Sequence, residues 1–373
     1  MKRKGIYSVM AFLLAAGLCL AKPVIGGAVE DADYLEKPCS VTVWAGDTQF
    51  REDLEKAQVV LDMYKVADAV EVQGGRGYVY ELTAPYKNQE ALKPIADQTD
   101  KDWRVLAQEA TKITLAEGAG IDPYVKPADG TEPDGNGAGA GASAPYRAKN
   151  PGEKIEVDSG LYLLVARGND LENYTKTIET EDGEKLVTMA QSPLYAYTFE
   201  PQLVSLPLGS VEGDGTTNIL SGEGSWDYDV EITLKAEQNR RYGSLEIVKT
   251  LQSYETKEPA MFVFQIEAVL DGETVYSDVE SIIFTEAGQE KILLENKIPA
   301  GAVVTVTEVY KGAAYSLETQ ADETQTRPIA ADQISTVEFV NRYNDEQKGG
   351  HGIVNQFRYN ETSGAWDWTP ITE

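Results

Sequence analysis

The feature that most constrains this chain is an alternation of apolar and polar residues with a period of two. Successive side chains of a β-strand point to opposite faces, so this pattern is typical of strands that bury one face. The segments that carry it are rich in Val, Ile, Tyr and Thr, which favour strands. They are residues 40–44, 59–66, 160–165, 229–234, 245–249, 261–270, 290–296, 303–310 and 336–343. The pattern predicts an all-β fold of short strands, which is typical of β-sandwiches.

The length of the chain, 373 residues, suits two tandem immunoglobulin-like sandwiches. We place the boundary near residues 238–242, where one strand ends and Gly243 begins another. This division predicts an N-terminal domain at 29–240, a C-terminal domain at 241–347, and a tail or hairpin at 348–373.

One stretch of the first domain departs from the strand pattern. Between residues 88 and 117 the apolar side chains recur at helical spacing, and Pro94 is expected to split this segment. Residues 127–145 are mostly Pro, Gly, Ala, Asp and Ser, which is typical of a flexible loop. Because strand signals resume at Ile155, we interpret residues 86–154 as a partly helical insertion in the first sandwich.

The N-terminus has the order of a secretory signal. Basic residues at 2–4 precede an apolar run at 5–21, and small residues allow cleavage after Ala21 or Ala28. We therefore predict a signal peptide over residues 1–28. No second apolar segment follows, so we expect a secreted or cell-surface protein with no membrane insertion of the mature chain.

Composition excludes several functions. A net charge of −28 argues against binding nucleic acid or an anionic membrane through charge. A single histidine argues against a His-based triad or a His-rich metal site. The acidic loops do not have EF-hand spacing, so we expect neither a metal nor a cofactor. Removal of the signal leaves Cys39 as the one cysteine, so an internal disulfide cannot stabilise the chain.

Three strands of the second domain place a polar residue on the face that is otherwise apolar. These residues are Lys249, Glu308 and Asn341. Buried polar groups without partners are costly, so the three must meet each other or lie beyond the strand ends. A buried lysine can be neutral and nucleophilic, and a buried glutamic acid can keep its proton and act as a shuttle. Attack of the lysine on the asparagine carboxamide would release ammonia and leave an isopeptide bond.

The second domain resembles a collagen-adhesin B-type (Cna-B) domain over residues 243–347. The family motifs are a Gly-Ser-Leu-x-Ile-x-Lys opening, a Pro-Ala-Gly turn, a Val-Thr-Glu strand and a Val-x-Phe-x-Asn close. They correspond, in the family order, to residues 243–249, 299–301, 306–308 and 337–341.

This resemblance implies an isopeptide cross-link between Lys249 and Asn341, with Glu308 as its catalytic proton shuttle. The alternative interpretation is a noncovalent cluster of the same three residues at the strand ends. Should the bond form to another asparagine, Asn344 and Asn355 are the nearest alternatives in the sequence.

The first domain resembles the N-terminal module of sortase-assembled pilus shaft subunits of the SpaA type. Residues 61–67, 160–163 and 201–207 are similar to family strands, and the pilin motif WxxxVxVYPK aligns without gaps on residues 226–235. The resemblance implies that Lys235 is the intermolecular pilin-motif lysine, although the Tyr-Pro pair before it is replaced. The alternative is an exposed lysine at the end of the last strand of this domain.

The first domain lacks the residues for an isopeptide bond of its own. Ala166 occupies the position where a Cna-B strand carries its glutamate, and no asparagine lies within residues 203–207. Lys65 is therefore expected to be a strand-edge charge with its ammonium group in water.

Together these features predict an extracellular structural pilin-like subunit or a pilus-associated surface protein of a fimbrium, and not a turnover enzyme. The implied partners are other pilin subunits and a sortase. The alternative is a secreted adhesin that binds a host, matrix or glycan ligand through the N-terminal domain or the aromatic tail. The end of the sequence leaves open whether a sorting signal follows Glu373, and with it a shaft or an accessory role.

Overall fold

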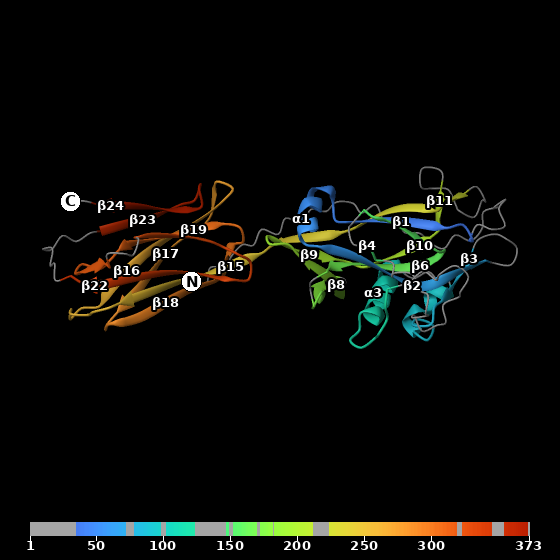
Figure 1. The fold of residues 1–373 in the computed structure, drawn as a ribbon, viewed down its shortest axis with the longest axis horizontal. Coiled ribbons are helices and arrows are strands. Elements are labelled where there is room, and N and C mark those ends of the chain that lie inside the picture. Colours follow the sequence, from blue (N-terminus) through green and yellow to red (C-terminus); the bar gives the residue numbers. More distant parts are fainter. Residues whose placement is uncertain are drawn as a thin grey trace.

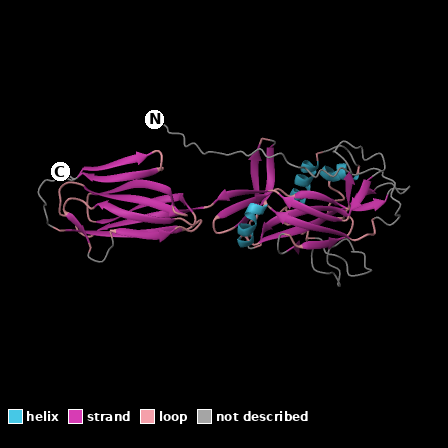
Figure 2. Ribbon diagram, turned by 90° about the horizontal axis from the view of Figure 1, so that it is seen from above, coloured by secondary structure: helices cyan, strands magenta, loops and turns pink. Residues whose placement is uncertain are grey.

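The computed structural model describes residues 35–71, 78–97, 102–123, 147–148, 152–169, 172–181, 183–211, 224–318, 323–344 and 354–371. The predicted signal peptide at 1–28 and the predicted loop at 127–145 lie outside the described residues. Two bodies made mainly of strands lie end to end in an elongated molecule (Figures 1 and 2). The prediction of an all-β fold with two sandwiches is confirmed.

The first sandwich has a three-stranded sheet in the order β13-β1-β5 and a larger sheet in the order β10-β6-β2-β3, in which β4 also pairs with β2. A four-stranded sheet, β14-β9-β8-β7, and the β11-β12 ribbon complete it. Its strands are β1 (Cys39–Ala45), β2 (Val59–Glu71), β3 (Tyr78–Leu82), β4 (Arg147–Ala148), β5 (Lys154–Val157), β6 (Gly160–Gly168), β7 (Thr175–Thr180), β8 (Gly183–Gln191), β9 (Tyr195–Phe199), β10 (Gln202–Leu206), β11 (Leu208–Val211), β12 (Gly224–Asp227), β13 (Asp229–Leu234) and β14 (Ala236–Arg240).

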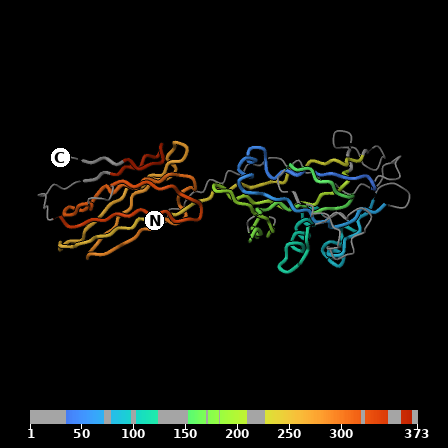
Figure 3. Tube along the Cα trace, viewed as in Figure 1, coloured from blue at the N-terminus to red at the C-terminus, as the bar shows by residue number. Residues whose placement is uncertain are grey.

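The core of the first sandwich forms where alternate residues of β1 and β2 face each other. Val41 and Val43 pack in one buried cluster with Leu61 and Met63. The opposite face of β2 is also buried, because the helical insertion covers it (Figure 3). This explains why β2 is apolar at nearly every position from Val59 to Tyr64 instead of alternating cleanly.

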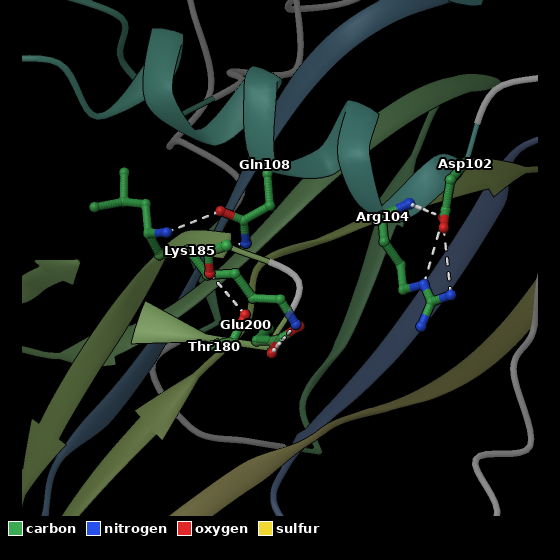
Figure 4. A network of polar contacts seen from close by, with 8 residues as sticks. Asp102, Arg104, Gln108, Thr180, Lys185 and Glu200 are labelled. Atoms are coloured by element: carbon green, nitrogen blue, oxygen red, sulfur yellow. Dashed lines mark hydrogen bonds and ion pairs between the residues drawn. The ribbon is translucent and has the colours of Figure 1, made fainter. Parts of the chain in front are cut away.

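The insertion contains the helices that its spacing predicts, namely α2 (Lys93–Ala96) and α3 (Trp103–Thr114), after the short helix α1 (Arg51–Lys56) near the N-terminus. Ile95 and Leu106 pack against the larger sheet. Pro94 lies in the first turn of α2, where a missing N–H costs nothing, so this proline begins a helix instead of splitting one. Asp102 caps α3 by accepting a hydrogen bond from the Arg104 N–H at 2.9 Å (Figure 4).

A side chain of α3 also closes part of the edge of β8. The Gln108 Oε1 accepts a hydrogen bond from the Leu186 N–H at 2.9 Å, and its Nε2 donates to the Leu186 carbonyl at 3.2 Å (Figure 4). The ladder between β8 and β9 runs only from Thr188 to Gln191. The carboxamide of Gln108 therefore takes the place of a neighbouring strand at Leu186 and ties the helix to the sheet.

The second sandwich consists of two four-stranded sheets, β18-β15-β22-β20 and β17-β16-β19-β21, that enclose a separate core. Within the first of these sheets β15 runs antiparallel to β18 and parallel to β22. The strands are β15 (Tyr242–Leu251), β16 (Ala260–Leu270), β17 (Glu273–Phe284), β18 (Gly288–Pro299), β19 (Val303–Tyr310), β20 (Tyr315–Leu317), β21 (Thr324–Pro328) and β22 (Ile334–Tyr343).

The C-terminal segment forms a hairpin of β23 (Val354–Asn360) and β24 (Ala365–Ile371). It lies beside β17 of the second sandwich, and the Trp366 N–H donates to the Ser277 Oγ at 3.0 Å (Figure 1). Two of the aromatic residues of this hairpin, Tyr359 and Trp366, pack against each other with their ring centroids 5.4 Å apart and their planes inclined by 60°.

Two consecutive arginines join the sandwiches at the junction between β14 and β15. Arg240 donates to the Tyr195 hydroxyl at 2.5 Å and to the Ala300 carbonyl at 3.1 Å. Arg241 donates to the Ser192 carbonyl at 2.5 Å and pairs with Asp332 at 2.6 Å. Ser192 belongs to the first sandwich and Asp332 to the second, so Arg241 bonds to both.

The main chain adds to this junction. The Arg241 N–H donates to the Leu194 carbonyl, and the Arg241 carbonyl accepts from the Ala300 N–H, both at 2.9 Å. Gly301 follows with a φ of 88°, and a Cβ at this position would lie 2.7 Å from the Leu194 side chain. The Pro-Ala-Gly turn of the second sandwich therefore packs directly on the first.

Of the helices that the structure describes, none combines the length and apolar character needed to cross a bilayer.

A buried lysine, glutamate and asparagine in the second sandwich

Three strands bring Lys249, Glu308 and Asn341 together in the core of the second sandwich. Lys249 lies on β15 and Asn341 on its parallel neighbour β22, whereas Glu308 lies on β19 in the opposite sheet. In the register of the parallel pair, Lys249 is opposite Phe339 and Asn341 is opposite Leu251. The lysine and the asparagine are thus diagonal neighbours on one face, with the glutamate across the core.

One oxygen atom joins the three side chains. The Lys249 Nζ lies 2.5 Å from the Glu308 Oε1, and the Asn341 Nδ2 donates to the same oxygen at 3.2 Å. The second hydrogen of the Asn341 amide goes to the main-chain carbonyl of Lys311 at 3.4 Å. The sequence places the three polar residues on inward faces, and the structure places them in one hydrogen-bonded cluster.

All three side chains are removed from water. Each of Lys249, Glu308 and Asn341 has 0% of its surface exposed. The rings of Phe262 and Phe264 lie 4.5 and 6.0 Å from the Lys249 Nζ. The polar cluster is therefore enclosed by apolar and aromatic side chains, in an environment of low dielectric where charged forms are costly.

Burial moves both ionisation equilibria toward the neutral forms. It lowers the pKa of Lys249 from 10.5 to about 8, against the opposing effect of the neighbouring carboxylate. It also raises the pKa of Glu308 above its ordinary value, although Lys249 and Asn341 act in the other direction. A neutral lysine is a nucleophile, and a protonated glutamic acid can give its proton away.

Two buried oxygen atoms of the cluster have no hydrogen-bond partner among the described residues. These are the Glu308 Oε2 and the Asn341 Oδ1. Both accept hydrogen bonds when the glutamate is ionised, so an ionised cluster leaves two buried acceptors unpaired at a cost of about 1–3 kcal/mol each. A proton on Glu308 changes this balance, because a carboxylic acid can also donate.

The other lysines considered in the sequence have different surroundings. Lys235 is exposed and lies between β13 and β14. The expectation that its strand is the last of the first sandwich is wrong, because β14 follows and pairs with β9 before the junction. The pilin-motif residue Trp226 packs against Tyr78, with 5.3 Å between ring centroids.

The expectation that Lys65 extends its ammonium group into water is also wrong. Its side chain is only 10% exposed, and its Nζ pairs with Asp68 at 2.6 Å. Lys65 is on the same face of β2 as Leu61 and Met63, so its position corresponds to an inward one. The residue opposite Lys65 on β6 is Tyr162, which has an aromatic ring and no carboxyl group.

Sequence reasoning missed the Lys311 carbonyl and the aromatic wall of Phe262 and Phe264. The phenylalanines alternate on one strand and could have been placed on the inward face. A main-chain carbonyl carries no residue-type signal, so its role depends on the shape of the turn.

Among the described residues, no group of three or more His, Cys, Asp or Glu side chains is arranged to hold a metal ion.

Comparisons with known proteins find a family profile and a set of solved structures. The profile, described as a domain of unknown function (DUF5979), matches residues 245–344, which include all three members of the cluster. No curated protein matches the chain.

The similar solved structures include three pilus proteins. The minor pilin GBS52 of Streptococcus agalactiae is 12% identical, with 84% of this chain and 99% of that chain covered and a TM-score of 0.21. A C-terminal fragment of the pilus adhesin SpaC of Lactobacillus rhamnosus GG is 9% identical, with 83% and 98% covered and a TM-score of 0.25. The major pilin T-13 of Streptococcus pyogenes is 9% identical, with 83% and 97% covered and a TM-score of 0.19.

Proposed function

We propose that the second sandwich closes an intramolecular isopeptide bond between Lys249 and Asn341, with Glu308 as the proton shuttle. The observation that carries this proposal is the shared oxygen. The Glu308 Oε1 contacts both the Lys249 Nζ, at 2.5 Å, and the Asn341 Nδ2, at 3.2 Å, in a cluster with no exposed surface. Nucleophile, acid and leaving group are therefore all held within one hydrogen-bonded group before any reaction begins.

The proposed reaction is balanced within the cluster. Neutral Lys249 attacks the Asn341 Cγ, so an Nζ–Cγ bond forms, and a tetrahedral centre results. Glu308 gives its proton to the Asn341 Nδ2 and receives one from the Lys249 Nζ. The Cγ–Nδ2 bond then breaks and ammonia leaves. The products are a secondary amide and a glutamic acid that has recovered its proton. Because the lysine amine and the asparagine carboxamide are both consumed, each chain reacts once.

The unpaired oxygen atoms support a protonated Glu308 as the reacting form. A proton on its Oε2 would turn that atom into a donor and, directed at the Asn341 Oδ1, would satisfy both atoms with one hydrogen bond. The same hydrogen bond would polarise the carboxamide and make its carbon more open to attack. Burial, which raises the pKa of Glu308, favours this form.

We further propose that the chain is a structural pilin-like subunit or a pilus-associated surface protein. The motifs of both domains support this role, as does the exposure of Lys235, which a sortase would need to reach. A self-formed covalent bond also suits a protein whose Cys39 is buried and unpaired. The assembly partners would be other pilin subunits.

Intact mass spectrometry of the secreted protein tests the bond. We expect a mass that is lower than that of the mature sequence by one molecule of ammonia, and a tryptic fragment in which the peptides of Lys249 and Asn341 are joined. The Glu308→Ala and Asn341→Ala variants should both have the full calculated mass. An unaltered mass in the wild-type protein would refute the bond and leave a noncovalent cluster.

A deficit of one ammonia that persists in Asn341→Ala would assign the bond to a different asparagine. Asn344 is the nearest alternative in sequence, and its main-chain N–H donates to the Ala314 carbonyl at 3.0 Å. The joined tryptic peptides distinguish these two positions directly.

A further inference from the structure

The turn that comes after β19 contacts the nitrogen atom that the proposed reaction expels. The Asn341 Nδ2 has two hydrogens. One is donated to the Glu308 Oε1 at 3.2 Å and the other to the Lys311 carbonyl at 3.4 Å. Lys311 comes three residues after Glu308, just past the end of β19. The leaving nitrogen therefore lies between the acid and a main-chain acceptor.

An irregularity in β19 precedes this turn. Val263 pairs with Tyr310 and Phe264 pairs with Glu308, so Val309 is an extra residue on β19. Such a β-bulge bends the strand and changes the direction of the chain after it, and bulges occur often beside reactive sites. Here the bulge separates Glu308 from the residues of the turn.

The turn is anchored on both sides. The Lys311 Nζ pairs with the Glu323 Oε1 at 2.5 Å, and the Glu323 carbonyl accepts the N–H of Glu308 at 2.9 Å. Gly312 then has a φ of 79°, in the left-handed region. These contacts form a closed circuit from Glu308 through Glu323 and Lys311 to Asn341 and back.

We infer that the Lys311 carbonyl is a catalytic acceptor for the leaving nitrogen, and that Gly312 is the residue that positions it. This inference rests on the proposed function. In the starting amide the Asn341 Nδ2 is neutral. After attack and protonation the same nitrogen carries a positive charge and is a stronger hydrogen-bond donor. The acceptor therefore stabilises the expelled group more than it stabilises the starting amide, which is the requirement for acceleration.

The turn that carries this carbonyl is more exposed than the cluster itself. Lys249, Glu308 and Asn341 have no exposed surface, whereas the Lys311 side chain is 33% exposed.

The conformation of Gly312 cannot be adopted easily by another residue. A φ of 79° is unfavourable for residues with a Cβ. In addition, a Cβ at this position would lie 2.9 Å from the Tyr315 Cδ2. Tyr315 is itself buried, so its ring cannot move away freely. A substitution at Gly312 should therefore turn the preceding peptide, and with it the Lys311 carbonyl, away from Asn341.

The rate of bond formation tests this assignment. Mature chain that has never folded, recovered in urea from inclusion bodies, is diluted into refolding buffer, and the loss of ammonia is followed by intact mass. We expect Gly312→Ala to close the bond roughly tenfold to a hundredfold more slowly than wild type. Gly312→Asn should lie between the two, because asparagine tolerates the left-handed region better. Gly272→Ala is the matched control, since Gly272 has a φ of 87° and no atom within 4 Å of an added Cβ.

The pH dependence of the rate separates positioning from general damage. Slower closure with an unchanged pH profile would support the assignment, because Lys249 and Glu308 would be unaffected. A shifted profile, or wild-type rates in both Gly312 variants, would overturn it while leaving the proposed bond intact. A Gly312→Ala chain without a folded near-ultraviolet circular dichroism spectrum is replaced by Gly312→Asn, for which the same criteria apply. If wild-type chain never loses ammonia, the proposed function itself is wrong.

Discussion

Lys249 and Asn341 are diagonal neighbours on two parallel strands, one at the start of the second sandwich and one at its end. Lys249 is opposite Phe339, and Asn341 is opposite Leu251. The chain between these strands forms every other strand of the sandwich. A bond between the two side chains would enclose the domain in one covalent loop without requiring the strands to move apart or cross.

Removal of the acid should weaken the second sandwich. We expect Glu308→Gln to prevent the bond and to lower the free energy of unfolding by on the order of 4–5 kcal/mol, the loop-closure value for a cross-link that spans roughly ninety residues. Denaturant unfolding followed by tyrosine and tryptophan fluorescence measures the difference, and limited proteolysis should cut within this sandwich first.

Leaving Lys249 buried without its partner would add a separate cost to that loss. The double variant Lys249→Met/Glu308→Gln removes this contribution, because neither residue then carries a charge. The proposal requires both variants to be less stable than wild type. A double variant as stable as wild type would show that the cluster contributes no covalent stabilisation.

The rate of bond formation should have a bell-shaped dependence on pH. The reacting pair holds one proton, as neutral Lys249 beside protonated Glu308 or in the equivalent ionised arrangement. At low pH both groups are protonated and the lysine is no nucleophile. Burial lowers the pKa of Lys249 to about 8. Above that pH the pair loses its last proton, and Glu308 has no proton to transfer to the leaving nitrogen.

The acid limb of this profile should lie above pH 4.5, because burial raises the pKa of Glu308 from that value. Refolding of unreacted chain in a series of buffers, with intact mass at timed points, gives the profile. A rate that increases steadily to pH 10 would mean that Glu308 does not act as an acid.

Lys235 should be the residue through which subunits are joined. With a cognate sortase and a donor subunit we expect ladders of covalent multimers on denaturing gels, because the Lys235 side chain is exposed between β13 and β14. Lys235→Arg should abolish them, since a guanidinium is not a nucleophile under these conditions. Lys297→Arg, at another exposed lysine, is the control. Ladders that survive in Lys235→Arg would assign the acceptor to another lysine.

The two arginines of the junction should hold the sandwiches in one orientation. We expect Arg240→Ala/Arg241→Ala to remove side-chain bonds to Ser192, Ala300 and Asp332. The cost should be about 1.5–3 kcal/mol for each bond to a main-chain carbonyl, and at most about 1 kcal/mol for the exposed pair with Asp332. Small-angle X-ray scattering should then show a broader distribution of interatomic distances.

Arg342→Ala is a suitable comparison for this measurement, because Arg342 is exposed on β22 and lies outside the junction. It should scatter like wild type. Identical scattering from all three proteins would mean that the main-chain bonds of Arg241 suffice to fix the orientation.

The inward position of the cluster could be predicted because a strand has only two faces. Once Leu245 and Ile247 are assigned to the core, alternation assigns Lys249 to it as well, and the same holds for Glu308 and Asn341. That the three actually touch depends on which strands are neighbours. The order of the Cna-B motifs along the chain suggested that these strands are neighbours. The periodicity of the strands alone does not predict which strands lie side by side.

Other parts of the structure could not be predicted from local pattern. Lys65 has an inward position, yet its partner Asp68 lies three residues further along the same strand, which alternation does not indicate. The contacts of Arg240 and Arg241 depend on how two separate cores meet. The Gln108 carboxamide replaces a strand at Leu186, and such a contact arises from tertiary packing and not from residue type.

The parallel pairing of β15 and β22 has a mechanical consequence. Tension that enters at Tyr242 and leaves beyond Tyr343 pulls the two strands in opposite directions along their length. The strands are then loaded in shear, so their paired residues bear the load together instead of separating one pair at a time. These pairs run from Ser244–Ile334 to Leu251–Asn341. With a covalent link between Lys249 and Asn341, the chain between them would leave the force-bearing path entirely, and this sandwich would become an inextensible segment of any fibre built from it.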